Sequence, residues 1–424
     1  MKIYNLFPLL AGEFKAWDEH IERASTMGFD WIFVNPIQKP GASGSLYSIA
    51  DYFQLNPLFV DKSARRKPDT QLKEVIKQAE KKYAVRMMID LVINHCAIDS
   101  ELVKQHPDWF LRNTKGKVEH PFCMEDGRKV VWHDLARFDH QHSADAKGQY
   151  NFFLKVIRHF INLGFKGFRC DAAYQLPSSL WRRLIEDIKK THPEVVFTAE
   201  TLGCTADQTK QTAQAGFDYV FNSSKWWDFS GPWLLEQYQL IREFVPSISF
   251  PESHDTERLY QESHNVDVLK QRYCFAALFS AGVMMPMGYE FGFKNPLHVV
   301  KTRSDDWETT NIDISAFISQ VNQIKSANKV FQEDGPINMI GHENDAVLFL
   351  WKASNCCQQE ALILLNKDPW NKQYFRVENL YHYVQSGESL SDLSIDYPLS
   401  YIPAPYEFEL NPGMVRVMVT TRSK

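Results

Sequence analysis

The stretch VRMMIDLVINH, residues 85–95, begins as an almost unbroken apolar run and ends in polar side chains. Strands of a parallel sheet that are covered on both faces are nearly continuous hydrophobic runs, so the apolar part predicts a buried strand. Charged and polar groups are rarely buried without a partner or a function. Asp90, Asn94 and His95, at the C-terminal end of this strand, are therefore candidate site residues.

Three further strand-like segments end in polar residues in the same way. They are GFRCDAA (167–173) with Arg169 and Asp171, VVFTAE (195–200) with Glu200, and FPESHDTER (250–258) with Glu252, His254, Asp255 and Arg258. Because the C-terminal ends of parallel barrel strands form one face, we expect these side chains to converge at a single mouth.

Eight strand-like runs alternate with amphipathic, helix-like segments along the first two thirds of the chain. The runs are IYNLF (3–7), WIFVNPI (31–37), VRMMIDLV (85–92), GFRCDAA (167–173), VVFTAE (195–200), YVFNSS (219–224), SISFPESHD (247–255) and VMMPMGYE (283–290). This order predicts an α/β fold of the (β/α)8 TIM-barrel type. An open, doubly wound sheet would use the same alternation, although the sequence has no glycine-rich phosphate loop.

Spacing and composition predict two additions to the barrel. From Asp90 to Asp171 the chain advances 81 residues, whereas one βα unit needs only about 30. We therefore expect a short domain B insertion at 96–140, after strand three. Beyond residue 336 short strand-like segments separated by turn residues predict a C-terminal antiparallel β-sandwich at 337–424, leaving 1–95 and 141–336 for the barrel.

Bulk properties narrow the class of protein. The net charge of −5 argues against nucleic-acid binding as the main role. Seven cysteines form no disulfide framework, and the N-terminus lacks the cleavage site of a secretion signal. With no apolar run of membrane-spanning length, we expect a cytoplasmic protein with no membrane or nucleic-acid partner. The oligomeric state is not encoded in any pattern that we can read.

Carboxylates from three strands suggest a particular chemistry. Two carboxyl groups about 5–5.5 Å apart carry out retaining glycoside cleavage, one as nucleophile and one as acid. Arg169, two residues before Asp171 on the same face of its strand, can hold that carboxylate ionised and oriented. Asp, Glu and His side chains at strand ends also build metal sites, so metal-dependent hydrolysis remains an alternative.

At these residues the sequence resembles the α-amylase superfamily, glycoside hydrolase family thirteen. DLVINH, GFRCDAA, the Glu of FTAETLG and ESHD match its four signature regions in order. The resemblance implies a barrel with a domain B and a C-terminal sandwich, acting on an oligosaccharide or α-glucan. It implies that Asp171 is the nucleophile, Glu200 the general acid/base and Asp255 the stabiliser of the transition state.

The resemblance also implies substrate-binding roles. His95 and His254 would hydrogen-bond the sugar at the cleaved bond, and Tyr47, in GSLYSIADY, would stack beneath it. Arg169 would orient the nucleophile. Asp90 would be a supporting carboxylate, or else simply a buried ion-pair partner of Arg169.

Other parts of the sequence leave the type of enzyme open. Tyr174 and Gln175 stand where many α-amylases have a Lys-His pair. Stretches such as HPDWF and CDAAYQLPSSLW resemble maltosyltransferases that use maltose 1-phosphate, for which Lys301 and Arg303 are phosphate-binding candidates by position only. The sequence leaves four functions open: a hydrolase, a transglycosylase, a maltosyltransferase and a non-catalytic glucan-binding member of the family. No cofactor is required, and Asn94 is a candidate calcium ligand. Glu290, in MGYEFGF, is expected to be structural.

Overall fold

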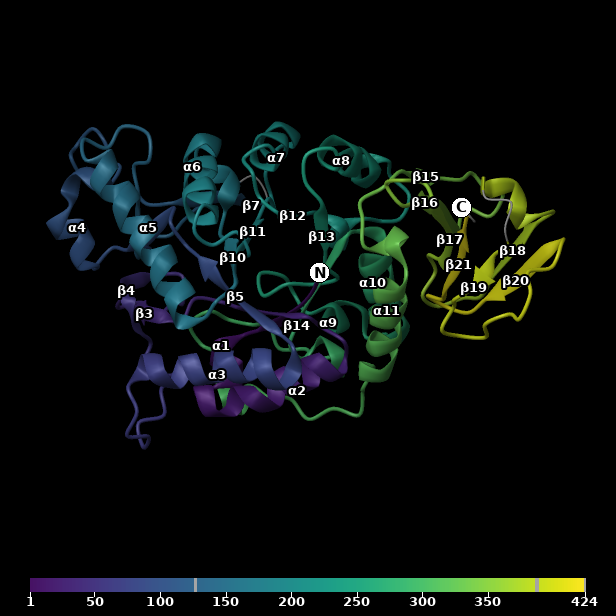
Figure 1. Cartoon of the computed structure of the whole chain (residues 1–424), viewed down its shortest axis with the longest axis horizontal. Helices are drawn as coiled ribbons and strands as arrows, with labels where there is room; N and C mark the ends of the chain where they lie inside the picture. The colour runs from purple at the N-terminus through teal and green to yellow at the C-terminus, as the bar shows by residue number, and fades with distance from the viewer. Residues whose placement is uncertain (126–127, 386–388, 423–424) are drawn as a thin grey trace.

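A computed structural model describes residues 1–125, 128–385 and 389–422 of the chain (Figure 1). Eight parallel strands form a closed barrel in the order β1-β14-β13-β12-β11-β10-β5-β2. They are β1 (Lys2–Leu6), β2 (Trp31–Val34), β5 (Arg86–Leu91), β10 (Gly167–Cys170), β11 (Val196–Ala199), β12 (Tyr219–Phe221), β13 (Ser247–Ser249) and β14 (Gly282–Pro286). The pairing of β1 with both β2 and β14 closes the barrel and excludes the open sheet. All eight predicted strands are confirmed.

Large apolar side chains fill the inside of the barrel. They are Ile3, Trp31, Phe33, Met88, Phe221, Ile248, Phe250 and Met284, all buried. A barrel of eight strands has an interior just wide enough for such side chains, so its centre is a packed core and not a pore. The polar residues therefore collect at the C-terminal mouth above this core.

Helices surround the barrel (Figure 1). The longer ones are α2 (Trp17–Thr26), α3 (Pro68–Tyr83), α5 (Ala146–Leu163), α6 (Ser178–Lys189), α7 (Ala206–Ala213), α8 (Trp233–Ile241), α10 (Val266–Phe279) and α11 (Ser315–Ala327), and α1 (Pro8–Ala11), α4 (Glu101–Gln105) and α9 (Leu259–Ser263) are short. Local chemistry sets their ends: Thr205 and Gln208 form a capping box at the start of α7. Gly164 ends α5 at φ 115°, where a Cβ would lie 2.9 Å from a methyl group of Ile76. Among the described residues, no helix has both the length and the apolar character needed to cross a bilayer.

The chain leaves the barrel between β5 and α5, where the insertion is predicted. This excursion contains the paired strands β6 (His95–Ala97) and β9 (Leu135–Arg137), helix α4, and the hairpin β7 (Phe122–Glu125) and β8 (Arg128–Val131). Its first strand pair begins at His95, so the excursion grows directly from the barrel mouth. The boundaries 96–140 stay a prediction. A second hairpin, β3 (Gln38–Pro40) and β4 (Ile49–Leu55), follows β2 and was not anticipated.

The C-terminal part is a β-domain, as expected. One antiparallel sheet has the order β15-β16-β17-β21-β19, formed by Ile337–Met339, Val347–Ala353, Gln359–Asn366, Val415–Thr421 and Ser391–Asp392. A second sheet pairs β18 (Gln373–Val377) with β20 (Tyr406–Leu410). Buried apolar side chains from both sheets, including Phe349, Leu364, Phe375 and Tyr406, make one core between them.

Two buried lysines meet at the C-terminal end of α10, Lys352 from β16 of the β-domain and Lys325 from α11 of the barrel. Lys352 Nζ donates to the carbonyls of Leu278 (3.3 Å) and Phe279 (2.6 Å). Lys325 Nζ donates to the carbonyls of Ala277 (2.8 Å) and Ser280 (2.6 Å). The last carbonyls of a helix have no partner within the helix and carry partial negative charge, so the two ammonium groups satisfy them.

Candidate active site

Arg169 stands at the centre of the polar cluster and contacts three carboxylates. Its Nη1 donates to Asp90 Oδ1 (2.9 Å) and Oδ2 (3.0 Å), and to Asp171 Oδ1 (2.7 Å). Its Nη2 pairs with Glu200 Oε1 at 2.9 Å. The pairing of β10 with β5 places Arg169 directly opposite Asp90. One guanidinium, 4% exposed, thus links the candidate nucleophile, the candidate acid/base and the supporting carboxylate.

The three candidate catalytic carboxylates differ in their access to solvent. The side chains of Asp171 and Glu200 are 12% and 14% exposed, whereas that of Asp255 is 50% exposed. The backbone N–H of Ala172 donates to Glu200 Oε2 at 2.6 Å, so both oxygens of this carboxyl are held. Ala172 adopts φ +41°, a left-handed conformation that costs an L-residue about 1–2 kcal/mol. Strain is thus stored immediately after the candidate nucleophile.

Tyr47 and His254 form the opposite side of the site. Tyr47 Oη donates to Asp90 Oδ2 (2.7 Å) and lies 2.6 Å from His254 Nε2. A phenol has one proton, so the His254 nitrogen that faces it carries the hydrogen. The same Nε2 lies 3.0 Å from Asp255 Oδ2. The Tyr47 and His254 rings stack in parallel, with centroids 5.7 Å apart. Tyr47, predicted to stack beneath a sugar, therefore also fixes the imidazole.

His95 is brought to the same region. Its side chain is buried, and among the described residues neither ring nitrogen has a partner with hydrogen-bond geometry, although the backbone of Tyr47 lies close enough to influence its pKa. Burial lowers the pKa of both His95 and His254, which keeps the two imidazoles neutral. Buried polar nitrogens without partners are costly. A hydroxyl of a bound substrate is the group that would satisfy them.

Burial and charge separate the titration of the carboxyl groups. Burial raises the pKa of Glu200 to about 8; the neighbouring Asp171 and Asp255 raise it too, and Arg169 lowers it. Burial raises the pKa of Asp90 to about 7 against the lowering effect of Arg169. Glu200 is therefore held as a proton donor near neutral pH. A protonated carboxyl beside a second carboxylate that is paired with an arginine is the arrangement that retaining chemistry uses.

Several polar residues from the sequence analysis lie elsewhere. Glu252 accepts from Arg258 Nη1 (2.8 Å) and from the backbone N–H of Leu259 (2.6 Å), so this buried pair is structural. Glu290 accepts from Tyr4 Oη (2.7 Å) and Arg23 Nε (3.0 Å), as expected for a structural residue.

Lys301 lies beside a separate hollow that Arg258, Asn295 and His298 also line. Arg303 donates to the carbonyls of Val300 and Thr302, both at 2.7 Å. Neither of the two phosphate-binding candidates lines the cavity that contains Glu200 and Asp255.

Two features of the site were missed. Asn35 Nδ2 donates to Tyr47 Oη (3.0 Å) and Asn35 Oδ1 accepts from Asn5 (2.9 Å); it lies near the end of the strand run WIFVNPI and follows the same polar-end pattern.

Trp226, 52% exposed, packs edge-on against Phe250 with centroids 6.0 Å apart. Phe250 lines the cavity with Glu200 and Asp255. Trp226 thus packs against one residue of the cavity wall without lining the cavity itself, and no local pattern distinguishes it from a core tryptophan.

The candidate calcium ligand Asn94 stays a prediction. The side-chain oxygen of Asn94 is buried without a partner, which fits one ligand. Calcium requires six to eight oxygen donors, commonly carboxylates. In the described part of the chain, no group of three or more His, Cys, Asp and Glu side chains could hold a metal ion. We derive no catalytic step from a metal.

The chain thus combines a closed (β/α)8 barrel with an Arg-bound carboxylate and a buried carboxyl of raised pKa at its C-terminal mouth. Comparisons with known proteins agree. The glucanotransferase domain of glycogen debranching enzymes matches residues 1–115. An α-1,4-glucan:maltose-1-phosphate maltosyltransferase of Burkholderia pseudomallei is 22% identical over 85% of this chain and 32% of its own length. One of Myxococcus xanthus is 21% identical over 85% of this chain and 56% of its own.

The solved structure of an α-amylase from Geobacillus thermoleovorans superposes with a TM-score of 0.78 at 16% identity, covering 100% of this chain and 98% of that one. The chain spans about a third to just over half of the length of the two maltosyltransferases. The chain thus has the fold of this α-amylase structure, and its sequence is similar to the maltosyltransferases and, over residues 1–115, to the glucanotransferase domain of glycogen debranching enzymes.

Proposed function

We propose that the chain is a retaining enzyme that acts on α-1,4-linked glucosyl units through a covalent glycosyl intermediate on Asp171. The observation that carries this proposal is the single guanidinium of Arg169 shared by Asp171 (2.7 Å) and Glu200 (2.9 Å). The ion pair orients Asp171 for attack, and the burial that raises the pKa of Glu200 to about 8 supports a protonated acid beside it.

Each residue has a step in this mechanism. Asp171 attacks the anomeric carbon while Glu200 gives its proton to the departing glycosidic oxygen, and the C–O bond of the substrate breaks. An acceptor hydroxyl then loses its proton to Glu200 and attacks the same carbon, which releases Asp171. Asp255 and the neutral His95 and His254 would bind sugar hydroxyls during both steps. Water as the acceptor gives hydrolysis, and a sugar gives transglycosylation.

The identity of the sugar donor is a second question, and the charge of the residues that line the cavity bears on it. The similarity to maltosyltransferases favours maltose 1-phosphate. The described residues that line the cavity at Glu200 include one cation, Arg169, and it is already shared among carboxylates. A phosphate dianion would meet uncompensated negative charge there. We therefore place a neutral α-glucan first as donor, and maltose 1-phosphate second.

Product analysis tests these proposals. The protein would be incubated with maltoheptaose alone, and with maltose 1-phosphate plus maltohexaose, with Asp171→Ala as control. Shorter sugars alone from maltoheptaose indicate a hydrolase, and redistribution to longer and shorter chains indicates a transglycosylase. Elongation with phosphate release only when maltose 1-phosphate is present establishes the maltosyltransferase. Activity equal to that of Asp171→Ala in every mixture contradicts the catalytic proposal and favours a glucan-binding role.

The need for a cofactor and the cellular location of the protein are two further proposals. We propose that catalysis needs no cofactor, with Asn94 kept as a candidate calcium ligand. Activity that survives exhaustive dialysis against a chelator supports this, whereas loss restored by calcium alone contradicts it. The six cysteines whose side chains are described are free thiols, which supports a reducing compartment such as the cytoplasm.

A further inference from the structure

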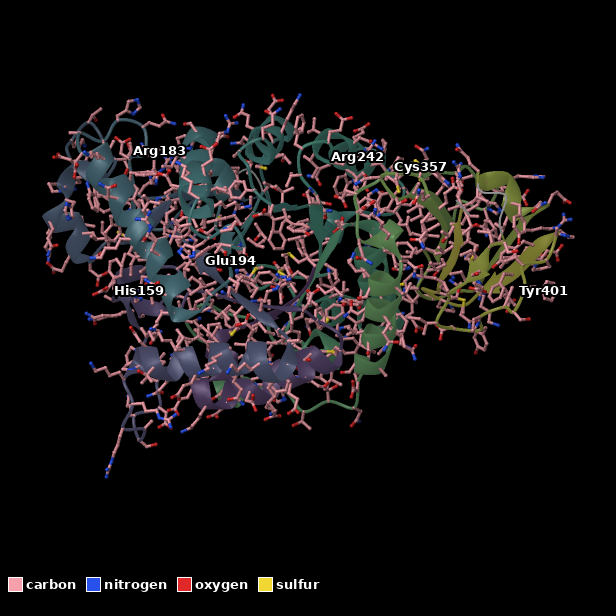
Figure 2. The ribbon with its side chains drawn as sticks, in the orientation of Figure 1. His159, Arg183, Glu194, Arg242, Cys357 and Tyr401 are labelled. Atoms are coloured by element: carbon pink, nitrogen blue, oxygen red, sulfur yellow. The ribbon has the colours of Figure 1, made fainter. Side chains whose placement is uncertain are left out.

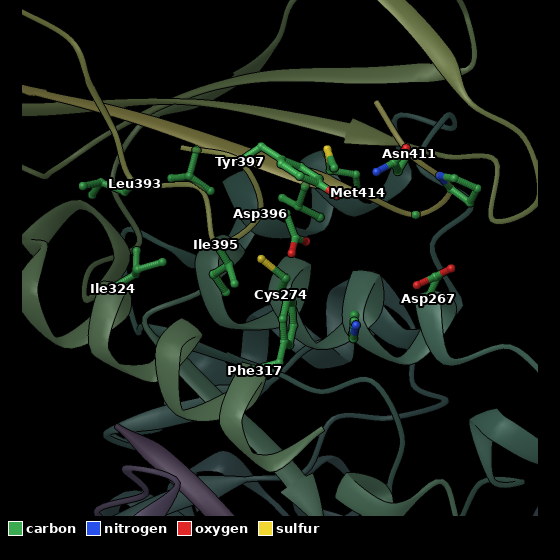
Figure 3. Close-up of a pocket in the computed structure, with 15 residues that line it drawn as sticks. Asp267, Cys274, Phe317, Ile324, Leu393, Ile395, Asp396, Tyr397, Asn411 and Met414 are labelled. Carbon is green, nitrogen blue, oxygen red and sulfur yellow. The ribbon is translucent and has the colours of Figure 1, made fainter. Parts of the chain in front are cut away.

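A hollow of about 310 Å³ lies between the barrel and the C-terminal β-domain, and none of the candidate catalytic residues lines it. Figure 3 shows Phe317 below it, and Tyr397 and Met414 above it. Its walls are fixed by backbone contact: a Cβ on Gly413 would come within 2.9 Å of the Asp267 carbonyl. Gln271 Nε2 also donates to the Asn366 carbonyl at 2.6 Å, which ties α10 to the β-domain. The hollow is therefore a permanent feature of the domain junction.

Tyr397 is held in a conformation that its sequence disfavours. It has φ +52°, although an L-residue avoids this region and a residue before proline favours extended backbone. Its ring is nonetheless 69% exposed, so burial of the ring does not offset the strain. Strained residues persist where the surrounding structure holds them, and they gather at ligand-binding sites.

A buried ion pair holds this loop in place. Arg416, fully buried and paired with Asp392, donates from Nη1 to the carbonyls of Asp396 (3.3 Å) and Tyr397 (3.2 Å). Asp392 also accepts from the backbone N–H of Leu399 (2.8 Å), beyond the tyrosine. An exposed aromatic ring on a loop fixed from both sides is pre-organised for contact, because little entropy is left to lose on binding.

The polar side chains around the hollow are available to a ligand. Among the described residues, those of Asp267, Asp396 and Asn411 make no hydrogen bond or ion pair, and Lys270 lies over the Phe317 ring at 5.7 Å. Asp396 and Cys274 point toward each other inside the hollow (Figure 3), and this carboxylate helps to raise the pKa of the thiol. Two carboxylates against one ammonium disfavour an anionic ligand. Carboxylate and amide acceptors beside aromatic faces suit the hydroxyls and C–H faces of neutral sugar rings.

We propose that this hollow is a second carbohydrate-binding site that takes a short, neutral α-glucan chain, with a sugar ring seated on Tyr397 and hydroxyls bound by Asp396 and Asn411. The choice of α-glucan over other neutral sugars rests on the function proposed above. The site lies outside the catalytic centre and would hold the enzyme on a polymer while other chain ends reach the barrel.

Stoichiometry of binding tests the proposal. The inactivated Asp171→Ala protein would be titrated with maltoheptaose in a calorimeter, alone and combined with Tyr397→Gly. Glycine adopts positive φ without steric cost, so we expect this change to remove the ring and leave the backbone of the loop unchanged. The matched control is Tyr401→Ala, an equally large tyrosine, 73% exposed, at the outer end of the β-domain (Figure 2). We expect two equivalents bound, one of them at least about fivefold weaker in the Tyr397→Gly protein and unchanged in the control.

The outcomes separate this inference from the catalytic proposal. One equivalent that survives Tyr397→Gly overturns the second site and leaves the active site standing. One equivalent that Tyr397→Gly abolishes supports the second site and overturns α-glucan binding at the barrel. Absence of binding overturns both. Asp396→Ala should weaken the same equivalent, and binding that falls steeply with added salt would contradict a neutral ligand.

Discussion

Replacing Arg169 by lysine perturbs the site at the point where its charges meet. Four contacts with three carboxylates, from 2.7 to 3.0 Å, depend on the planar fork of this guanidinium. An ammonium is a point charge on a flexible stem and cannot span all three partners. At least two charge-assisted bonds are lost, each contributing about 1.5–3 kcal/mol. Proton uptake by Asp90 and Glu200 offsets part of this loss, so we expect a decrease in stability of about 3 kcal/mol.

The sign of the pH dependence follows from the same contacts. Arg169 lowers the pKa of both Asp90 and Glu200, so its removal raises these pKa values further in the folded state. A folded state that binds more protons than the unfolded chain loses stability as pH rises. The deficit of Arg169→Lys should therefore be larger at pH 8 than at pH 6. Because Asp171 loses its orienting partner, activity should also fall by about a hundredfold or more.

Urea unfolding at both pH values and product formation from maltoheptaose measure these effects. Arg258→Lys is the matched control, because Arg258 is as deeply buried and pairs with Glu252 outside the cluster. The control should lose stability and keep its activity while folded. A folded Arg169→Lys protein with wild-type activity, or with a stability loss below about 1 kcal/mol, would refute the role assigned to this guanidinium.

Three further predictions follow from other residues. Because Glu200 must be protonated to act as an acid, kcat/KM should fall as pH rises through about 8, and a kcat/KM profile flat from pH 7 to 9 contradicts this assignment. Trp226→Ala should lower the ratio of transfer to hydrolysis by severalfold, by analysis of maltoheptaose products, whereas Trp233→Ala, on α8 and 37% exposed, should leave it unchanged. Burial lowers the pKa of Lys352 to about 8, so the unfolded chain binds more protons above that pH. The free energy of unfolding of the wild type should therefore rise relative to that of Lys352→Met from pH 8 to 10, by up to about 1.4 kcal/mol per pH unit, as measured by urea unfolding.

The barrel was predictable because its strands are short apolar runs with a fixed period and order. The closure of the sheet was not, since the pairing of β1 with β14 joins residues some 280 positions apart and leaves no local signal. Hairpin β3–β4 was missed because Gln38–Pro40 and Ile49–Leu55 mix polar and apolar residues without clean alternation.

The site was predictable where polar residues interrupt buried strands. Asp171, Glu200 and Arg169 lie together for that reason, and Asn35 could have been found by the same rule. Trp226 and Tyr397 could not, since their importance depends on exposure and backbone conformation, which the sequence does not reveal. Glu252 shows the limit of the rule, because a polar strand end can equally belong to a structural ion pair.

The shared guanidinium has a consequence for the timing of the reaction. In the proposed glycosyl intermediate Asp171 is an ester, so its negative charge is lost, and with it one of the influences that raise the pKa of Glu200. Arg169 is then left with fewer anions to neutralise, so its attraction for the Glu200 carboxylate grows. The residue that entered the cycle as a proton donor is thereby turned into a proton acceptor for the second half. In the proposed cycle, the charge on Asp171 therefore sets the proton affinity of Glu200 in each half-reaction.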